Sequence, residues 1–474
     1  MPRSLCPVKS NSGQLPHLAI DLGTRFQEAG FEISLVGGWV RDAVMGRIQN
    51  DLDFTTSANP EQILSIVTGW ADAIWEVGIE FGTVGLLKNG HNIEITTYRA
   101  EAYDENSRKP TVQFGTSLED DLSRRDFTIN AMAITLPKGE LFDPFGGINH
   151  IASQTITTPG KPEQSFSDDP LRMLRAARFA SQLNFNIEES VLKAMHDMAS
   201  RLAIISSERI RDELEKLLLS NNPRKGLEVL ILTSIADIVL PEIPALKLEI
   251  DEHHRHKDVY EHSLIVLEQA IDLEQSHTPR LEPDIVLRLA ALLHDIGKPK
   301  TRKLESGGGV SFHHHELVGA RMAKKRLQEL RFSNDVVKAV TRLIELHLRF
   351  HGYGTGQWTD SAVRRYVRDA GDELVRLHKL TRADCTTRNK QKAATLSQNY
   401  DALEVRIEEL RAEEELNAIR PDLNGAEIME ILGIKAGPTV GKAYSYLLEL
   451  RLDRGPMSKD EAKSELLSWW KTQQ

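Results

Sequence analysis

A pair of glycines, Gly37 and Gly38, separates a largely apolar run from a stretch with helical character, and this junction constrains the fold more than any other feature. Residues 31–36 predict a short strand, and residues 40–45 predict the first turns of a helix. Glycine permits the tight turn and the close backbone approach that such a junction requires. Free N–H groups at the start of a helix suit phosphate oxygens. The junction therefore predicts a phosphate-binding turn.

Two aspartates, Asp51 and Asp53, follow on a second predicted strand. Alternate residues of a strand share a face, so we expect the two carboxylates side by side. Paired carboxylates beside bound phosphates suit two divalent cations, and Mg²⁺ prefers such oxygen ligands. A Gly-Gly pair or an Asp-x-Asp sequence alone is usually a surface turn, but the ordered combination is more specific. It resembles the nucleotidyltransferase superfamily that includes DNA polymerase β and the tRNA CCA-adding enzymes.

Three further blocks extend this resemblance. Residues 123–132 read SRRDFTINAM, residues 142–147 read FDPFGG, and residues 168–179 read DDPLRMLRAARF. With GGWVRD and DLD, they occur in the order found in class II CCA-adding enzymes and bacterial poly(A) polymerases. The resemblance implies that Asp51 and Asp53 are catalytic and hold Mg²⁺.

The same resemblance implies a set of nucleotide-binding residues. The triphosphate contacts are Gly37, Gly38 and Arg41, and the block linked to the ribose supplies Arg124, Arg125, Asp126 and Asn130. The sequence leaves open which of the two adjacent arginines touches the nucleotide. Glu94 is either a third catalytic acid or a structural acid on a half-buried strand.

Asp169 and Arg172 match the protein template that reads the incoming base in this family. A carboxylate accepts a hydrogen bond from cytosine N4 or adenine N6, and an arginine donates to the ring acceptor beside it. Uracil and guanine reverse this order and would leave both side chains unpaired. Many relatives carry Glu where this chain has Asp168.

The start of this block also has a structural interpretation. Asp169 before Pro170 suits a helix start, although Ser167 could cap the helix instead. Arg172, Arg175 and Arg178 recur every three residues, and all three are assigned to nucleotide binding. This spacing lets Arg172 and Arg175 share a site more easily than Arg178.

A series of histidines and aspartates marks the second half of the chain. The apolar helical run 287–293 ends at His294-Asp295, just before a glycine and a proline stop the helix. Adjacent His and Asp can bind one ion through nitrogen and oxygen. The pattern resembles the HD phosphohydrolase domain. The resemblance implies a divalent metal of unknown identity held by His262, His294, Asp295 and Asp384, with His315 and His347 as candidates for a second metal.

The predicted fold is an α+β head of the polymerase-β nucleotidyltransferase type followed by a long all-α body. We expect strands at 81–87 and 92–98 joined by a turn at Asn89-Gly90, and no strands after Asp168. The domains are an N-terminal tail 1–18, a nucleotidyltransferase head 19–152, a nucleotide-reading neck with RNA-binding helices 153–235, an HD-type helical domain 236–400 and a C-terminal helical tail 401–474. The tail resembles a tRNA-contacting segment, or it is merely a capped helical pair.

Bulk properties limit the partners and the location. The 474 residues carry a formal net charge of −10, so any RNA contact must use a local basic patch. Two cysteines exclude a disulfide framework and a cysteine-based zinc site. We recognise no signal peptide or membrane-spanning run, and we expect a cytoplasmic location without a membrane partner.

The function implied by the resemblance is CCA addition to tRNA by an enzyme with a fused HD domain, most like the actinobacterial type. Its partners would be tRNA, CTP and ATP, and pyrophosphate would be released. One alternative is a poly(A) polymerase or an enzyme that adds only C or only A. Alternatives of other classes are an HD metal-dependent phosphohydrolase acting on RNA ends or nucleotides, and a non-catalytic RNA-binding protein.

Overall fold

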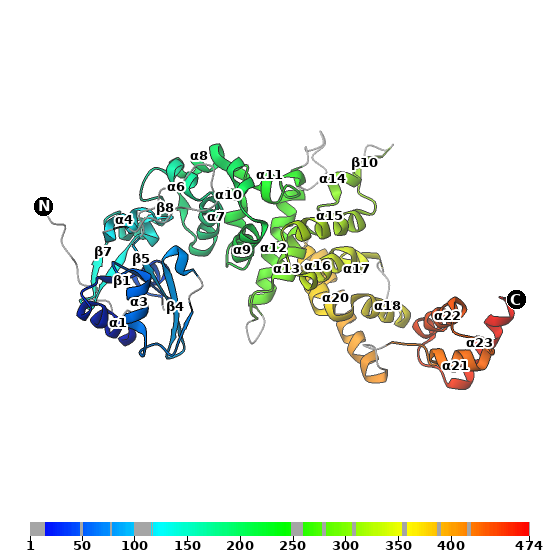
Figure 1. Ribbon diagram of the computed structural model, residues 1–474. Helices are drawn as coiled ribbons and strands as arrows, with labels where there is room; N and C mark the ends of the chain where they lie inside the picture. Colours follow the sequence, from blue (N-terminus) through cyan, green and yellow to red (C-terminus); the bar gives the residue numbers. More distant parts are fainter. Residues whose placement is uncertain are drawn as a thin grey trace. The chain divides into compact units, whose positions relative to one another are not determined.

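The computed structural model describes residues 15–47, 51–75, 78–98, 115, 117–247, 259–276, 281–305, 310–352, 358–385, 390–414 and 419–473. The chain divides into two compact units, Met1–Val239 and Leu240–Gln474 (Figure 1). Most of the predicted N-terminal tail, 1–18, lies outside the described residues. The first helix, α1 (His17–Glu28), begins before the end of this predicted tail. No helix among the described residues is both long enough and apolar enough to cross a lipid bilayer.

The head of the first unit is built on a seven-stranded sheet with the order β3-β4-β5-β2-β1-β6-β7. β2 and β5 run parallel, and the other neighbouring pairs are antiparallel. All four residues of β1 are buried, as its largely apolar sequence predicts. The strands are β1 (Ile33–Val36), β2 (Leu52–Thr56), β3 (Ala73–Trp75), β4 (Thr83–Lys88), β5 (His91–Thr97), β6 (Ala133–Leu136) and β7 (Glu140–Phe142).

Helices complete the core of the head. Leu22 and Phe26 of α1, one turn apart, are fully buried in the cluster formed with the sheet. α3 (Pro60–Val67) begins at a capping box in which Asn59 and Gln62 exchange backbone-to-side-chain hydrogen bonds. The remaining helices of the head are α2 (Gly38–Val44), α4 (Leu118–Ser123) and α5 (Gly147–Ala152). α2 contacts β1 and β2, and α4 contacts β2, so both lie beside the predicted catalytic strand.

A helical neck forms the rest of the first unit, and α7 is its centre. α7 packs against α9 and α10, and most of its residues are buried. Gly226 allows α10 to approach closely, because a Cβ there would lie 2.6 Å from the Ala177 carbonyl oxygen. The helices are α6 (Pro162–Asp168), α7 (Leu171–Leu183), α8 (Glu189–Met198), α9 (Ser207–Leu218), α10 (Pro223–Leu232) and α11 (Ala236–Val239).

The second unit is mainly helical. α12 packs on α13 and α19, and α13 also packs on α16, which pairs with α15. Its helices are α12 (Val259–Gln275), α13 (Ile285–Leu293), α14 (Lys298–Thr301), α15 (His315–Glu329), α16 (Asn334–Leu346), α17 (Arg349–Gly352), α18 (Asp360–Ala370), α19 (Leu374–Asp384), α20 (Lys390–Glu413), α21 (Gly425–Leu432), α22 (Pro438–Arg454) and α23 (Lys459–Lys471). The last three share a small hydrophobic core of their own.

The α+β head and the helical body confirm the predicted fold class, but one detail was wrong. Short strands do follow residue 168: β9 (Asn186–Ile187) pairs with the earlier β8 (Thr155–Ile156), and β10 (Lys303–Leu304) pairs with β11 (Val310–Ser311). Strands of two residues are too short to show periodicity in a sequence.

The structure also distinguishes the two alternatives that the sequence left open for the start of α7. Ser167 does not cap this helix, because it lies within α6. Asp169 separates α6 from α7, and its Oδ1 accepts a hydrogen bond from the Leu171 N–H at 3.1 Å. Asp169 therefore supports the first turn of α7, as the alternative interpretation expected.

Candidate functional site

One of the predicted catalytic aspartates, Asp53 of β2, lies beside the turn between β1 and α2, and Asp51 directly precedes β2. Gly37 has φ of 71°, and a Cβ at this position would lie 3.5 Å from both Asp53 Oδ2 and Arg125 Nη1. Its positive φ favours glycine, so the turn between β1 and α2 brings bare backbone next to a carboxylate and a guanidinium. Gly38 is the first residue of α2. The predicted strand–turn–helix arrangement is present.

A third acid joins the two aspartates. Glu94 on β5 stands directly opposite Asp53 in the parallel register of β2 and β5. Burial raises the pKa of Asp53, the charges of Glu94 and Asp51 raise it further, and Arg125 opposes them. Like charges held together in this way favour a bound cation. This placement makes Glu94 a candidate ligand, one of the two alternatives that the sequence left open.

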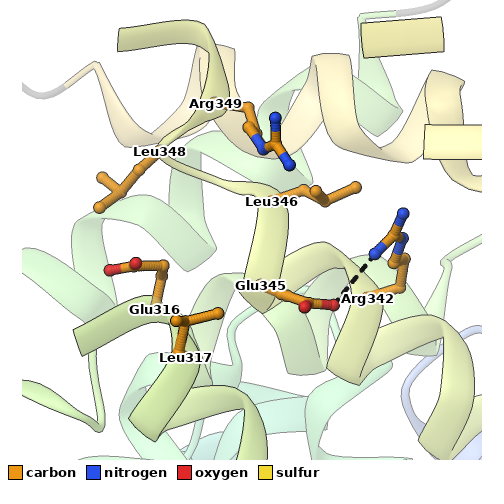
Figure 2. Close-up of a pocket in the computed structure, with 7 residues that line it drawn as sticks. All are labelled: Glu316, Leu317, Arg342, Glu345, Leu346, Leu348 and Arg349. Carbon is orange, nitrogen blue, oxygen red and sulfur yellow. Dashed lines mark hydrogen bonds and ion pairs between the residues drawn. The ribbon is translucent and has the colours of Figure 1, made fainter. Parts of the chain in front are cut away.

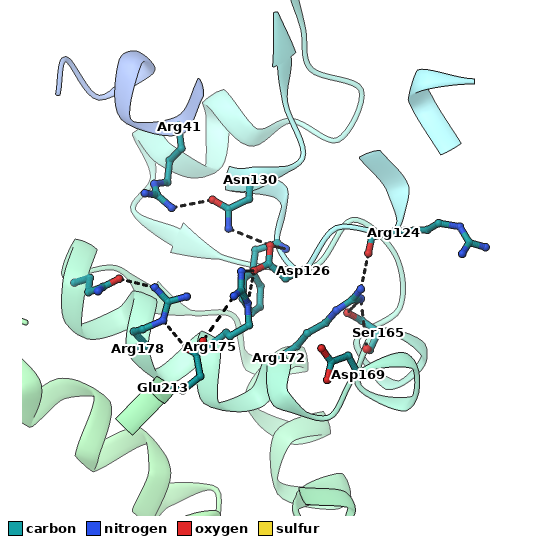
Figure 3. Close-up of polar contacts among 12 residues, drawn as sticks. Arg41, Arg124, Asp126, Asn130, Ser165, Asp169, Arg172, Arg175, Arg178 and Glu213 are labelled. Atoms are coloured by element: carbon teal, nitrogen blue, oxygen red, sulfur yellow. Dashed lines mark hydrogen bonds and ion pairs between the residues drawn. The ribbon is translucent and has the colours of Figure 1, made fainter. Parts of the chain in front are cut away.

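Arg41 lies behind the turn and is buried. It donates to both carboxylate oxygens of Asp42, at 3.0 and 2.8 Å, and its Nη1 donates to Asn130 Oδ1 at 2.9 Å (Figure 3). Asn130 in turn donates to Asp126 Oδ1 at 3.0 Å. A hydrogen-bonded chain thus connects α2 to the predicted ribose block.

Asp126 is the acceptor at the centre of this chain. Arg175 of α7 donates to its Oδ2 from Nε at 2.9 Å and from Nη2 at 2.6 Å (Figure 3). Burial alone would raise the pKa of Asp126, but Arg175 and the hydrogen bond from Asn130 outweigh it and lower the pKa to about 2. Asp126 is therefore ionised at neutral pH and ties the head to α7.

Glu213, which the sequence analysis missed, organises the arginines of α7. It is buried on α9, binds Arg178 Nε at 2.5 Å and lies 3.7 Å from Arg175 Nη1. Arg175 and Arg178 therefore share a carboxylate, a pairing that the spacing of the arginines did not predict. The spacing within α7 could not reveal this, because the shared partner comes from another helix. The available signal was an acid three residues after Ile210 and four before Leu217, on the apolar stripe of α9.

Arg172 has its own set of acceptors. Its Nη1 donates to Ser165 Oγ at 2.7 Å, and its Nη2 donates to the Arg124 carbonyl oxygen at 2.6 Å (Figure 3). Figure 3 shows the Arg124 side chain directed away from this cluster. Arg125 Nη2 instead reaches Asp121 at 3.3 Å, close to the Gly37 turn. Of the two adjacent arginines, Arg125 lies beside the predicted catalytic aspartate.

Asp169 is held by partners different from those of Arg172. Its Oδ1 accepts from Leu171, and its Oδ2 accepts from Arg209 Nη2 of α9 at 3.0 Å. Asp168 is the last residue of α6 and accepts from Gln164. Asp169 and Arg172, which are predicted to read the base, therefore lie at the same junction between a loop and a helix. Different hydrogen-bond partners orient each of the two side chains.

The six predicted HD residues converge in the second unit. Among the described residues, two groups of three have ligand atoms within 4.8 Å of one another: His262, His294 and Asp384 form one, and Asp295, His315 and His347 form the other. Asp295 thus groups with the predicted second set of histidines. It also faces the first group, because its Oδ2 lies 3.2 Å from His294 Nε2 and its Oδ1 lies 3.2 Å from His315 Nε2. One carboxylate therefore stands between the two groups.

Backbone carbonyls orient three of the four histidine rings. Nδ1 of His294, His315 and His347 lies 2.9, 2.8 and 2.7 Å from the carbonyl oxygen three residues earlier. A carbonyl only accepts, so each Nδ1 carries the proton, and the lone pair of a neutral ring lies on Nε2. Such backbone bonds are typical of metal-binding histidines. The donor set therefore fits divalent cations.

The charges of the cluster agree with this donor set. Burial lowers the pKa of His347 to about 4, and His294 adds to that effect, so His347 is neutral at pH 7. Burial also opposes the charged form of His294, but Asp295 and Asp384 outweigh it and raise the pKa of His294 to about 10. A cation would therefore compete with a proton for His294. Lys298 Nζ lies 2.6 Å from Asp295 Oδ2 and balances part of the negative charge.

A pocket of about 520 Å³ lies at the start of α15 and the end of α16, and none of the six HD residues lines it. Glu316 follows His315, whereas Leu346 and Leu348 flank His347 in the chain. Figure 2 shows Arg342 and Glu345 paired on one wall, with Arg349 nearby and Glu316 on another side. The volume is in the range of small-molecule sites.

Models of three known domain families match the chain. Residues 33–157 match the poly A polymerase head domain, residues 184–246 match the domain described as "Probable RNA and SrmB- binding site of polymerase A", and residues 259–389 match the HD domain. Domains of the first and third kinds typically use divalent metals.

Solved structures share the fold. A Bacillus stearothermophilus CCA-adding enzyme in complex with CTP aligns with a TM-score of 0.65 at 23% identity, over 97% of this chain and 99% of that one. A Thermotoga maritima CCA-adding enzyme complexed with tRNA aligns with a TM-score of 0.61 at 20% identity, over 97% of each chain. These likenesses confirm the polymerase-β type of head followed by a helical body.

Curated relatives are CCA-adding enzymes. The match to the Leuconostoc mesenteroides protein is 42% identical over 240 residues, which is 50% of this chain and 58% of that protein. Such matches span little more than half of the relative's length. The match to the Streptococcus pyogenes protein is 31% identical over 440 residues, 92% of this chain and 93% of the relative. The narrower resemblance to actinobacterial enzymes stays an expectation. Because the Streptococcus match extends over nearly the whole of both proteins, the chain belongs to the family of CCA-adding enzymes.

Proposed function

We propose that this protein adds CCA to the 3′ ends of tRNA, consuming CTP and ATP and releasing pyrophosphate. The observation that carries the proposal is the arrangement in the first unit. Asp53 and Glu94 lie in register beside the Gly37 turn, and Asp169 and Arg172 are presented from one junction by separate partners. Solved CCA-adding enzymes of the same fold are complexed with CTP, ATP and tRNA, which supports these three partners here.

Asp51 and Asp53 are the residues that we assign to metal binding in the head, with Glu94 as a candidate third ligand. Their hard carboxylate oxygens favour Mg²⁺, which when bound would offset the charge of the triphosphate and of the attacking and leaving oxygens. The backbone of Gly37 and Gly38, with Arg125, would hold the triphosphate. The tRNA 3′ hydroxyl attacks the α-phosphorus, and pyrophosphate leaves in line.

Asp169 and Arg172 are the residues that we assign to reading the base. The carboxylate accepts from the exocyclic amine of cytosine or adenine, while the guanidinium donates to the neighbouring ring nitrogen. Arg41, Asp126, Asn130, Arg175 and Arg178 support the nucleotide through the hydrogen-bonded chain described above, and Arg124 supports Arg172 through its carbonyl oxygen.

Each predicted domain receives a role on this proposal. The head, 19–152, transfers the nucleotide, and the neck, 153–235, reads the base and binds RNA. The HD-type domain, 236–400, holds a separate metal centre, and the tail, 401–474, contacts tRNA. We propose the cytoplasm as the place of action, where tRNA ends are completed.

Incorporation of single nucleotides tests the proposal. Purified protein is incubated with a tRNA that ends before CCA and with one labelled nucleotide at a time, and with a second tRNA that ends in CC. We expect C on the first substrate and A on the second. Long A tails on both would instead indicate a poly(A) polymerase, and addition of one base only would indicate a partial enzyme.

A second activity is favoured by one specific observation. Asp295 faces both groups of ligand atoms. We infer that the second unit is a metal-dependent phosphohydrolase that acts on RNA ends or nucleotides. Metal analysis of the purified protein and hydrolysis of a generic phosphodiester, with and without a chelator, test this. Absence of both bound metal and hydrolysis would contradict it.

A further inference from the structure

The carboxylate of Asp169 is anchored at both oxygens. Leu171 N–H donates to Oδ1 at 3.1 Å, and Arg209 Nη2 donates to Oδ2 at 3.0 Å. The terminal torsion of an aspartate is otherwise broad, so two anchors on different oxygens fix the plane of the group. Each oxygen offers about two acceptor sites. One acceptor site on each oxygen therefore stays available to a ligand.

We propose that Arg209 is a specificity-determining positioning residue, which sets the direction in which Asp169 presents its free acceptor site to the incoming base. This inference rests on the proposed function, in which Asp169 reads the base. Arg209 does not itself need to touch the nucleotide. It acts by restricting Asp169 to one orientation before the nucleotide binds, so that less ordering is required on binding.

The fold holds Arg209 rigidly enough for this role. Glu213 lies one turn further along α9, and its buried ion pair with Arg178 fixes α9 against α7. Arg209 lies on α9, and Asp169 directly precedes the first turn of α7. The buried contact between these two helices therefore sets the relative position of Asp169 and Arg209.

Stability alone does not explain Arg209. The side chains of the pair are 52% and 26% exposed, and ion pairs of this kind contribute about 0–1 kcal/mol. Arg209 also stands in the first turn of α9, where the helix dipole disfavours a cation. The positive charge of Arg209 therefore destabilises the start of α9, whereas it stabilises the carboxylate of Asp169.

The test compares three variants in steady-state addition of CTP and UTP to tRNA that ends before CCA. In Arg209→Ala we expect the ratio of kcat/KM for CTP over UTP to fall by up to about fivefold, which is the upper end for a half-exposed charged pair. Arg209→Lys keeps one cationic donor and should restore part of the ratio. Arg211→Ala is the matched control on the same helix, because Arg211 pairs with Asp212 instead, and it should leave the ratio unchanged. The melting temperature should not change in any of the three.

Other outcomes overturn the inference. An equal loss with both nucleotides, together with a raised KM for tRNA, would mean that Arg209 binds RNA phosphate. An unchanged ratio in Arg209→Ala would mean that Leu171 alone orients Asp169. Failure of the proposed function looks different, because the unmodified protein would then not prefer CTP on this tRNA.

Discussion

Replacing Asp126 by asparagine should remove a large part of the stability of the first unit. The Asp126 carboxylate accepts two hydrogen bonds from Arg175, one from Asn130 and one from the Phe127 N–H. Although burial opposes ionisation, these partners lower the pKa of Asp126 from 3.8 to about 2. That shift corresponds to about 2–3 kcal/mol in the free energy of unfolding at neutral pH.

A second argument gives a similar magnitude. Removing one partner of a buried ion pair costs about 3–5 kcal/mol, because the other charge is left without compensation. The Arg175 side chain is 33% exposed, so water can hydrate it and reduce the cost. We therefore expect Asp126→Asn to lower the free energy of unfolding by about 2–3 kcal/mol.

Hydrogen exchange in denaturant measures this loss within the right part of the molecule. The chain has two compact units, so a single unfolding transition cannot be assumed, and peptides from α7 report on the first unit. Asp197→Asn is the control, because Asp197 is exposed and pairs with Lys193, which lies on the same helix, α8. This substitution should lower the free energy of unfolding by less than about 1 kcal/mol. Equal losses in the two variants would refute the reasoning.

The pH dependence follows from the sign of the shift. The folded pKa of Asp126 is depressed, so its contribution is present above the unfolded value of 3.8 and is lost as the pH falls through about 2. The stability difference between the unmodified protein and Asp126→Asn should stay constant from pH 8 to pH 5 and narrow only in the acid range. A difference that narrows already between pH 8 and pH 6 would assign the effect to another group.

Three further predictions concern the proposed sites. Asp53→Asn should abolish nucleotide addition at an unchanged melting temperature, and normal incorporation would remove Asp53 from the metal site. Arg172→Ala should weaken CTP and ATP use by about ten- to a hundredfold, as expected for a lost charged hydrogen bond, and should weaken the rejection of UTP and GTP. Steady-state rates with all four nucleotides check this prediction. Full discrimination by the variant would place base reading elsewhere. His294→Ala combined with Asp295→Ala should remove the metal from the second unit and any phosphodiesterase activity while nucleotide addition continues, and parallel loss of both activities in a folded protein would contradict separate sites.

Features encoded in short segments could be predicted from the sequence. The apolar run before Gly37, the helix after it and the aspartates on the next strand form a local pattern, and β1, α2 and β2 follow it closely. The HD histidines were identified by their order along the chain. The structure brings all six predicted residues together, as the resemblance implied.

Contacts between distant helices could not be predicted in this way. Nothing in the spacing of the α7 arginines reveals that Glu213 from α9 takes both Arg175 and Arg178. The contact of Arg209 with Asp169 likewise depends on how α9 packs on α7. The position of Asp295 between two ligand groups depends on the opposite directions of its two oxygens, which only coordinates give.

The order of bases added to tRNA tests the central proposal most directly. The protein is incubated with a tRNA transcript that ends before CCA and with equal concentrations of all four nucleoside triphosphates, and the 3′ ends of the products are sequenced. The proposed function predicts products that end in C, CC or CCA and extend no further, with Asp53→Asn leaving the transcript unchanged. Ends of mixed sequence, or runs of A added directly to the transcript, would contradict it.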